Sequence, residues 1–264
     1  MPNPTSPPTP GRLVLMPNTL DLATTPTPIT DVLSAGALAR AASLGHWVVE
    51  NAKSSRAFLK RVDAVQPLCQ PLQALQLHEM PRPRKGSGED LGRQVWEGLL
   101  APALAGHDLG LLSDAGLPAV ADPGAALVEA AHRLGLVVEA WAGASSITMA
   151  LAASGLNGQR FAFEGYLPQE AEARARRIRA LEARSLQEGQ TQLAIETPYR
   201  NNTLLAALIE VLKPGTRLSV ACGLTSAEGH CRTRSVADWR ATAPAQGSEH
   251  LPTHLPAVFM WLAN

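Results

Sequence analysis

Two aspartates stand in a loop of small residues near the middle of the chain, in the stretch GLLSDAGLPAVADPG at residues 110–124. An apolar run ends at Ser113, and Asp114 and a glycine at position 116 follow it. Ligands of open α/β sheets bind outside the carboxyl ends of the parallel strands, and a glycine lets the backbone approach a ligand closely. Asp114 is therefore a candidate acceptor for hydroxyl or amino groups of a ligand. Asp122 precedes a helical pattern, and here the sequence favours a helix cap over ligand contact.

Three more polar stretches follow apolar runs. Gly-Ala-Ser-Ser at 143–146 opens a helix, so it either receives a carboxylate or phosphate on its backbone N–H groups or is a simple serine cap. Glu-Thr-Pro-Tyr-Arg at 196–200, with two asparagines beside it, is either a ligand site or a cap with a solvated arginine. Glu-Gly-Tyr-Leu-Pro at 164–168 offers an aromatic ring that can stack on a planar base.

Several common chemistries lack support in the 264 residues. There is no G-x-G-x-x-G and no Walker lysine, and the seven histidines lack metal-ligand spacing, so no metal site is expected. Basic and acidic residues both number 23, so no overall charge attracts nucleic acid or an anionic membrane. Three cysteines without a C-x-x-C pair predict a reducing, cytoplasmic setting. No apolar run approaches the ~20 residues that span a bilayer, so we expect no membrane partner.

A predicted helix at 170–189 is rich in arginine. Such a stripe can track phosphates, but glutamates are interleaved with the arginines, which is more typical of a solvated face. The arginines are Arg174, Arg176, Arg177, Arg179 and Arg184.

Strand-like apolar runs alternate with helical patterns, which predicts an α/β fold with a largely parallel sheet. The expected strands are 13–16, 47–50, 108–113, 137–140, 191–196, 217–222, 232–235 and 257–262, and the stretch 160–168 predicts a further strand followed by a Gly/Pro turn. The expected helices are 29–44, 54–62, 88–104, 125–134, 169–188 and 200–212, with caps at Asp31 and Ser54. Residues 67–88 are interpreted as a surface excursion, and the proline-rich start predicts a disordered or extended tail over 1–11. A Ser-Gly-Leu-Asn-Gly joint predicts two domains, 12–154 and 155–264.

Taken in order, the loops resemble a known family. Residues 113–118 and 121–124 are similar to the S-D-A-G-x-P…D-P-G signature of the ribosomal RNA 2′-O-methyltransferase I family, which belongs to the tetrapyrrole-methylase (class III) S-adenosylmethionine methyltransferases. The turn at 143–145, the R-F…E-G-Y-L-P of 160–168 and the E-T-P-Y-R of 196–200 match further motifs of that family. The resemblance runs from about residue 13 to the end, and the order of the motifs makes it specific.

The resemblance implies a two-domain α/β class III methyltransferase fold, with a parallel-sheet N-terminal domain, a mixed-sheet C-terminal domain and a cleft between them that holds S-adenosylmethionine. It implies a methyltransferase that forms a homodimer, with the ribose of ribosomal RNA as the family-default acceptor. The cofactor-binding residues that it implies are Leu112, Ser113, Asp114, Ala115, Gly116, Ser145, Ser146, Thr197, Tyr199 and Ala221. The substrate-side catalytic candidates are Glu50, Lys53 and Tyr199.

Two departures from the family pattern leave the methyl acceptor open. The first loop, at 16–21, lacks the glycine of the family pattern, and the family's E-D-T-R is Glu-Asn-Ala-Lys at 50–53. The first hypothesis is ribose methylation of ribosomal RNA, and the second is methylation of a tetrapyrrole or another small molecule. The third is a degenerate regulator that binds S-adenosylmethionine without turnover, which the missing glycine and Asn51 favour.

Overall fold

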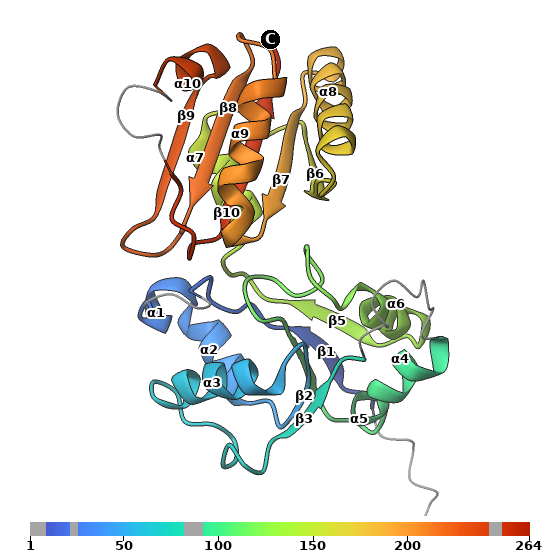
Figure 1. Ribbon diagram of the computed structural model, residues 1–264. Coiled ribbons are helices and arrows are strands. Elements are labelled where there is room, and N and C mark those ends of the chain that lie inside the picture. The colour runs from blue at the N-terminus through green and yellow to red at the C-terminus, as the bar shows by residue number, and fades with distance from the viewer. Residues whose placement is uncertain (1–8, 22–25, 82–91, 243–249) are drawn as a thin grey trace, which may run out of the picture. The chain divides into compact units, whose positions relative to one another are not determined.

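A computed structural model of the protein describes residues 9–21, 26–81, 92–242 and 250–264. The chain divides after Ala144 into two compact units, and each is built around one five-stranded sheet (Figure 1). The α/β class and the pairing of a parallel with a mixed sheet are therefore confirmed.

The sheet of the first unit is parallel throughout, with the order β3-β2-β4-β1-β5. Its strands are β1 (Arg12–Leu15), β2 (His46–Val49), β3 (Gln76–Glu79), β4 (Leu109–Leu112) and β5 (Val137–Ala140). Its helices are α1 (Ile29–Val32), α2 (Ala35–Ala42), α3 (Ala52–Asp63), α4 (Arg93–Leu99), α5 (Ala101–Leu104) and α6 (Ala125–Arg133). Because β4 lies between β2 and β1, the loops that leave these strands are neighbours.

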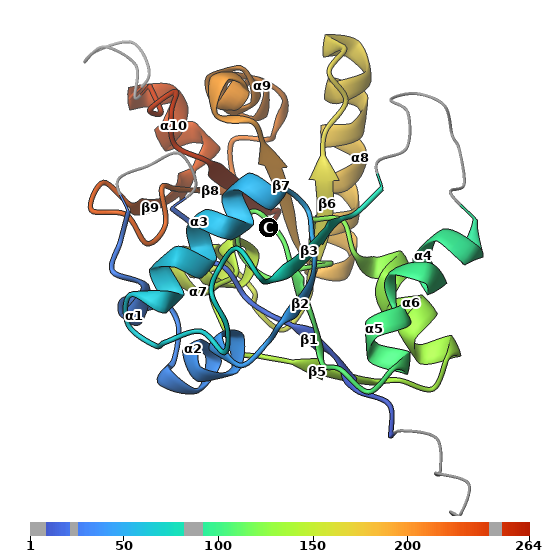
Figure 2. The ribbon, with the colours of Figure 1, turned by 90° about the horizontal axis from the view of Figure 1, so that it is seen from below.

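Helices cover both faces of the parallel sheet, as Figure 2 shows. The helices α1–α3 pack on one face, where Phe58 and Leu59 join the buried Trp47. The helices α4–α6 pack on the other face, around Leu100 and Leu127. The face under α3 depends on Gly110 of β4, because a Cβ there would lie 2.3 Å from the Trp47 ring. Each face therefore has its own apolar core.

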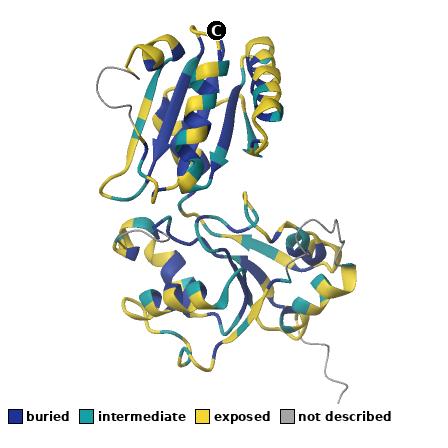
Figure 3. Ribbon diagram, in the orientation of Figure 1, coloured by how far each residue is buried: buried dark blue, intermediate teal, exposed yellow. Residues whose placement is uncertain are grey.

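The sheet of the second unit is mixed, with the order β6-β7-β10-β8-β9. Its strands are β6 (Phe161–Tyr166), β7 (Thr191–Glu196), β8 (Arg217–Cys222), β9 (His230–Ser235) and β10 (Ala257–Leu262). Its helices are α7 (Ser146–Ser154), α8 (Ala171–Glu188), α9 (Asn201–Val211), α10 (Val236–Thr242) and the short 3-10 helix η1 (Pro198–Arg200). β6 pairs parallel with β7, whereas the other pairs are antiparallel. The inner strands of this sheet are largely buried, as Figure 3 shows.

The division between the units falls before α7, not after residue 154 as the two predicted domains had it. Ile147 and Leu151 of α7 pack in one apolar cluster with Val258 and Met260 of β10. The flexible joint that suggested the boundary therefore lies inside the second unit, after a helix that its sheet holds in place.

Other differences concern caps and one strand. Ser34 caps α2 by accepting from the backbone of Ala37, and Asn51 caps α3, so neither Asp31 nor Ser54 is a cap. The predicted surface excursion contains β3, whose residues are mostly exposed and lack apolar alternation. Of the predicted tail, residues 1–8 lie outside the described residues, but Gly11 is buried and donates to the carbonyl of Ala103, so the fold begins before residue 12.

Candidate active site

Asn18, in the loop after β1, ties that loop to the loop after β4. Its side-chain nitrogen donates to the carbonyl oxygens of Ser113 and Asp114, both at 3.0 Å. Its backbone nitrogen donates to the carbonyl of Gly116 at 2.8 Å, and the N–H of Gly116 donates back to Thr19 at 3.3 Å. Four hydrogen bonds therefore fix the small-residue loop at 113–116, the predicted cofactor cradle, although the sequence did not point to Asn18.

Glycines let three loops come together at the ends of β4, β1 and β5. A Cβ at Gly143 would lie 2.2 Å from the Cβ of Pro17. Gly116 has a φ of +67°, and a Cβ there would lie 3.3 Å from Leu20 and 3.6 Å from the carbonyl of Ala144. The first loop therefore needs no glycine of its own for this close approach, because the opposing loops supply it.

A buried ion pair fixes the rest of the first loop. Arg61 of α3 donates to both carboxylate oxygens of Asp21, at 3.1 and 3.0 Å, and to the carbonyl of Thr27 at 2.7 Å. Burial alone would raise the pKa of Asp21, but hydrogen bonds from Arg61, Thr19 and Thr27 outweigh it and lower that pKa. The loop after β1 is therefore held to α3 by a charged, bidentate contact.

Asp114 and Glu50 stand at the carboxyl ends of the neighbouring strands β4 and β2. The backbone nitrogen of Asp114 donates to Glu50 Oε2 at 3.1 Å, and Ser54 Oγ donates to Asp114 Oδ1 at 2.5 Å. The structure therefore brings together Glu50, a predicted catalytic residue, and the predicted cradle. Lys53, the second catalytic candidate, lies exposed in the first turn of α3.

Asp122 does not cap α6, which corrects the prediction. The residue before the helix is Gly124, with a φ of +130°, and no side chain caps this helix end. Asp122 makes no hydrogen bond or ion pair among the described residues. Burial, reinforced by the charges of Glu50 and Asp114, raises its pKa to about 7. Asp122 is therefore a carboxyl group that changes charge near neutral pH, and it lies two residues before the cap position of α6.

Asn51, where the family pattern has an aspartate, serves as the cap of α3. Its side-chain oxygen accepts from the backbone nitrogens of Lys53 at 2.9 Å and Ser54 at 3.5 Å. Aspartate and asparagine are about equally good at this position. The exchange therefore preserves the local structure at the end of β2.

The polar cluster at 196–200 in the second unit is largely satisfied within itself. Glu196 accepts from the backbone of Thr197 at 2.8 Å and pairs with Arg200 at 3.2 Å. Asn202 exchanges two hydrogen bonds with the backbone of Leu251. Tyr199, in contrast, is 74% exposed. A structural role therefore explains the charged residues of this motif, Glu196 and Arg200. It does not explain Tyr199.

Of the remaining predicted site residues, Leu112 ends β4 and Ala115 lies in the loop after it, and the others belong to the second unit. Ser145 is buried at the start of α7, yet its side chain makes no cap hydrogen bond, and Ser146 is the first residue of the helix. Thr197 follows β7, and Ala221 is buried in β8. Their contact with a cofactor stays a prediction.

The arginines of α8 are mostly engaged within the protein. Arg177 and Arg184 pair with Glu164 at 2.6 and 3.4 Å, and Arg176 pairs with Glu172 at 3.3 Å. Arg174 donates to the backbone carbonyl of Gln169 at 2.8 Å. These contacts favour the solvated, ion-paired face over a stripe that tracks phosphates.

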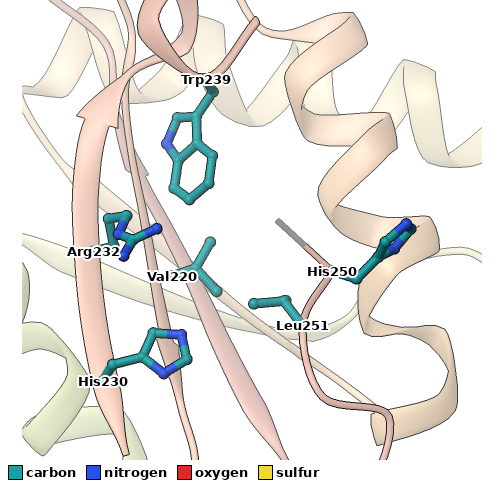
Figure 4. Close-up of a pocket in the computed structure, with 6 residues that line it drawn as sticks. All are labelled: Val220, His230, Arg232, Trp239, His250 and Leu251. Carbon is teal, nitrogen blue, oxygen red and sulfur yellow. The ribbon is translucent and has the colours of Figure 1, made fainter. Parts of the chain in front are cut away.

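Figure 4 shows a small pocket, with a volume of about 120 Å³, on the side of the second sheet that α9 and α10 cover. It is lined by Val220, His230, Arg232, Trp239, His250 and Leu251. None of the predicted site residues lies there, so the pocket is separate from the loops at 113–124. The described residues contain no cluster of metal-ligating side chains and no helix long and apolar enough to cross a membrane.

Comparisons with known proteins agree with this arrangement. A ribosomal RNA small subunit methyltransferase I from Pseudomonas aeruginosa is 36% identical over 140 residues, which are 52% of this chain and 48% of that protein. The chain thus spans about half the length of the curated relatives that it matches. The crystal structure of the methyltransferase CobJ covers 94% of this chain and 93% of its own, with a TM-score of 0.54 and 16% identity.

A second solved structure, a uroporphyrin-III C-methyltransferase from Thermus thermophilus complexed with S-adenosylhomocysteine, covers 96% of this chain and 97% of its own, with a TM-score of 0.50 and 16% identity. At these identities the two structures bear on the fold alone. The model of the tetrapyrrole (corrin/porphyrin) methylases matches residues 47–238, well over half of the sequence. By this match the chain belongs to the tetrapyrrole (corrin/porphyrin) methylase family.

Proposed function

We propose that this chain is an S-adenosylmethionine-dependent methyltransferase that acts on the ribose 2′-hydroxyl of ribosomal RNA. The observation that carries the proposal is the small-residue loop at 113–116, fixed by Asn18 at the carboxyl end of β4 and shaped by a glycine in the left-handed region. Family membership and the relatives named ribosomal RNA small subunit methyltransferase I support it. We further propose a cytoplasmic homodimer, as the resemblance implies.

The first unit offers a site that fits S-adenosylmethionine. The hydroxyl of Ser113 is fully buried and has no hydrogen-bond partner among the described residues, so a polar group of a ligand can satisfy it. Gly116 and Gly143 keep the loops close and leave no side chain in the way. Ser113, Asp114 and Gly116 would hold the cofactor, which supplies an activated methyl group when bound. Ser145, Ser146, Thr197, Tyr199 and Ala221 are proposed as contacts from the second unit.

The chain's own task is to orient the acceptor oxygen in line with the methyl group, to exclude water and to receive the hydroxyl proton. The fixed loops provide the rigid support that such alignment needs. Glu50 lies at the same edge of the sheet as the cradle and is proposed to face the acceptor. Lys53 and Tyr199, both exposed, are proposed to contact the substrate.

The observations give less support to the two alternative functions, a degenerate regulator and a methyltransferase that acts on a tetrapyrrole. A degenerate regulator was favoured by the missing glycine and by Asn51, but Asn51 caps α3 as an aspartate would, and glycines of the opposing loops permit the close approach. A tetrapyrrole acceptor is compatible with the zero net charge and with the ion-paired arginines of α8. The names of the curated relatives nevertheless favour RNA.

The test is binding followed by transfer. Calorimetry should show binding of S-adenosylmethionine, and radiolabelled methyl groups should pass to small ribosomal subunits that lack this methylation but not to a porphyrinogen. No binding at millimolar cofactor would refute the methyltransferase. Transfer to the porphyrinogen alone would replace the RNA acceptor by the tetrapyrrole.

A further inference from the structure

Glu50 and the buried hydroxyl of Ser113 stand side by side on one face of the parallel sheet. Side chains alternate between the faces along a strand. Leu111 packs with the core under α4–α6 and Leu112 with the core under α1–α3, so Ser113 returns to the α4–α6 face. Val48 and Val49 alternate in the same way, which places Glu50 on that face too.

The register of the two strands makes these residues direct neighbours. Val49 pairs with Leu112, and the ladder continues because the N–H of Glu50 donates to the carbonyl of Leu112 at 3.0 Å. Ser113 is therefore the residue opposite Glu50. Its hydroxyl is fully buried and unpartnered among the described residues, and it lies on the same face of the sheet as the side chain of Glu50.

Asp122 reaches the same place from the loop that leads into α6. Gly124, two residues further on, lies against β4, because a Cβ there would be 3.1 Å from the side chain of Leu111. Asp122 interacts electrostatically with Glu50 and Asp114, which follow β2 and β4. We call Glu50, Asp114 and Asp122 the acid cluster. Two members are engaged: Asp114 accepts from Ser54, and Glu50 accepts from the backbone of Asp114. Asp122 alone has a carboxyl group without a hydrogen bond from the described residues.

The loop holds Asp122 there at a conformational cost. Ala119 and Ala121 have φ values of +65° and +62°, in the left-handed region that alanine avoids, and Gly124 has +130°. Backbone strain of this kind is concentrated at functional sites. Asp122 therefore occupies a strained loop near two other carboxyl groups, and we identify no contribution of its carboxyl group to the fold.

We propose that Asp122 is the general base of the reaction and takes the proton that the acceptor hydroxyl loses on methylation. The inference rests on the proposed function. In the step, the acceptor oxygen forms a bond to the methyl carbon and the bond from that carbon to sulfur breaks, with its electron pair going to sulfur. The O–H proton passes to a carboxylate oxygen of Asp122, so the sulfonium charge is lost and the carboxylate becomes neutral.

The electrostatics of the acid cluster suit this role. A general base works best with a pKa near the working pH, and burial with the charges of Glu50 and Asp114 raises the pKa of Asp122 to about 7. Glu50 and Asp114 are the two charged groups that face Asp122, and both disfavour its charged form. The unpartnered hydroxyl of Ser113, on the same face as Glu50, can donate or accept one further hydrogen bond.

The experiment compares the full-length wild type with Asp122→Asn, Asp122→Glu and the control Asp31→Asn. Asp31 is exposed in α1, and its side chain makes no hydrogen bond or ion pair among the described residues. Initial rates of methyl transfer to unmethylated small ribosomal subunits are measured from pH 5.5 to 9 with saturating S-adenosylmethionine. Calorimetry gives the Kd of S-adenosylmethionine for each variant, and thermal unfolding confirms that each is folded.

We expect Asp122→Asn to lower kcat by about 10²–10⁴-fold, to change the Kd by less than about threefold and to lose the fall in rate below pH 7. Asp122→Glu should recover part of the rate, and Asp31→Asn should match the wild type. Wild-type kcat and pH profile in Asp122→Asn would overturn the inference. So would a loss of cofactor binding that accounts for the whole loss of rate, since Asp122 would then hold the cofactor. Wild-type protein that binds cofactor but transfers no methyl to the subunits would refute the proposed acceptor and this inference with it.

Discussion

Two polar loops at strand ends, one in each unit, look alike in sequence and differ in how their charges are satisfied. At the end of β7, the carboxylate of Glu196 is paired with Arg200 and also accepts from the backbone of Thr197. At the end of β4, Asp122 is half-buried without a hydrogen bond among the described residues, beside two other acids. The charged side chains of the loop after β7 are paired and stabilise the fold. The carboxyl group of Asp122, in the loop after β4, has no such role in the fold.

The largest effect on stability is expected from Arg200→Ala. The side chain of Glu196 is only 5% exposed, so removing Arg200 leaves a buried charge that only the hydrogen bonds from Thr197 stabilise. We expect a loss of about 2–4 kcal/mol in the free energy of unfolding of the second unit, measured by urea denaturation. The matched control is Arg176→Ala, whose partner Glu172 is 84% exposed and whose pair should contribute below about 0.5 kcal/mol. Equal losses in the two variants would contradict the contrast between the loops.

Gly116→Ala tests whether the loop after β4 needs its backbone for ligand approach. Gly135→Ala is the control, because Gly135 has a similar φ of +72° but nothing within 4 Å of the added Cβ. Both changes should cost about 1–2 kcal/mol of stability through the left-handed backbone. Only Gly116→Ala, which meets Leu20 and the carbonyl of Ala144, should weaken binding of S-adenosylhomocysteine, by about tenfold in calorimetry. Unchanged affinity in Gly116→Ala would remove this loop from the cofactor site.

Asp122→Asn should stabilise the protein at alkaline pH. The pKa of Asp122 is raised from 3.8 to about 7, so the folded state binds the proton more tightly than the unfolded chain does, and wild-type stability rises as the pH falls from about 7 toward 4. Asparagine stays neutral throughout. A fully shielded group with this shift would give roughly 4 kcal/mol, but solvent reaches this side chain, and we expect ~1–2 kcal/mol at pH 8. The measurement is urea denaturation at pH 8, where the gain should appear, and at pH 4, where it should vanish. A gain of equal size at both pH values would contradict the raised pKa of Asp122 as its cause.

The sequence was most informative where burial is continuous. The strands Thr191–Glu196, Arg217–Cys222 and Ala257–Leu262 match their predicted bounds because each is an apolar run between clear turn residues. β3 was missed because its residues are mostly exposed and show no alternation. In the second sheet, local patterns therefore predicted the bounds of the inner strands better than those of the edge strands, whereas in the first sheet the edge strand β5 matched its predicted bounds.

The candidate site was only partly predictable, because its decisive contacts join distant parts of the chain. The bidentate pair between Arg61 and Asp21 leaves no local signal in the sequence. Asp122 was interpreted as a cap because Asp is common at helix starts, but Gly124 occupies that position. The preference for aspartate as a helix cap applies to a single position. Asp122 lies two residues before that position, so its carboxyl group does not cap the helix.

The smallest effect is expected from Asn51→Asp, the change that restores the family's acid after β2. Asn51 accepts from the backbone of Lys53 at 2.9 Å, and an aspartate would accept from the same N–H groups, so stability should stay within about 0.5 kcal/mol of the wild type. Asn51→Ala, which keeps no cap, should cost about 1 kcal/mol. In the methyl-transfer assay, Asn51→Asp should show no gain of rate, because this side chain caps the helix and we propose that Asp122 receives the proton. A large gain of rate would mean that an acid at position 51 takes part in the chemistry. The reactive carboxyl group would then belong to the loop after β2 and not to the loop after β4.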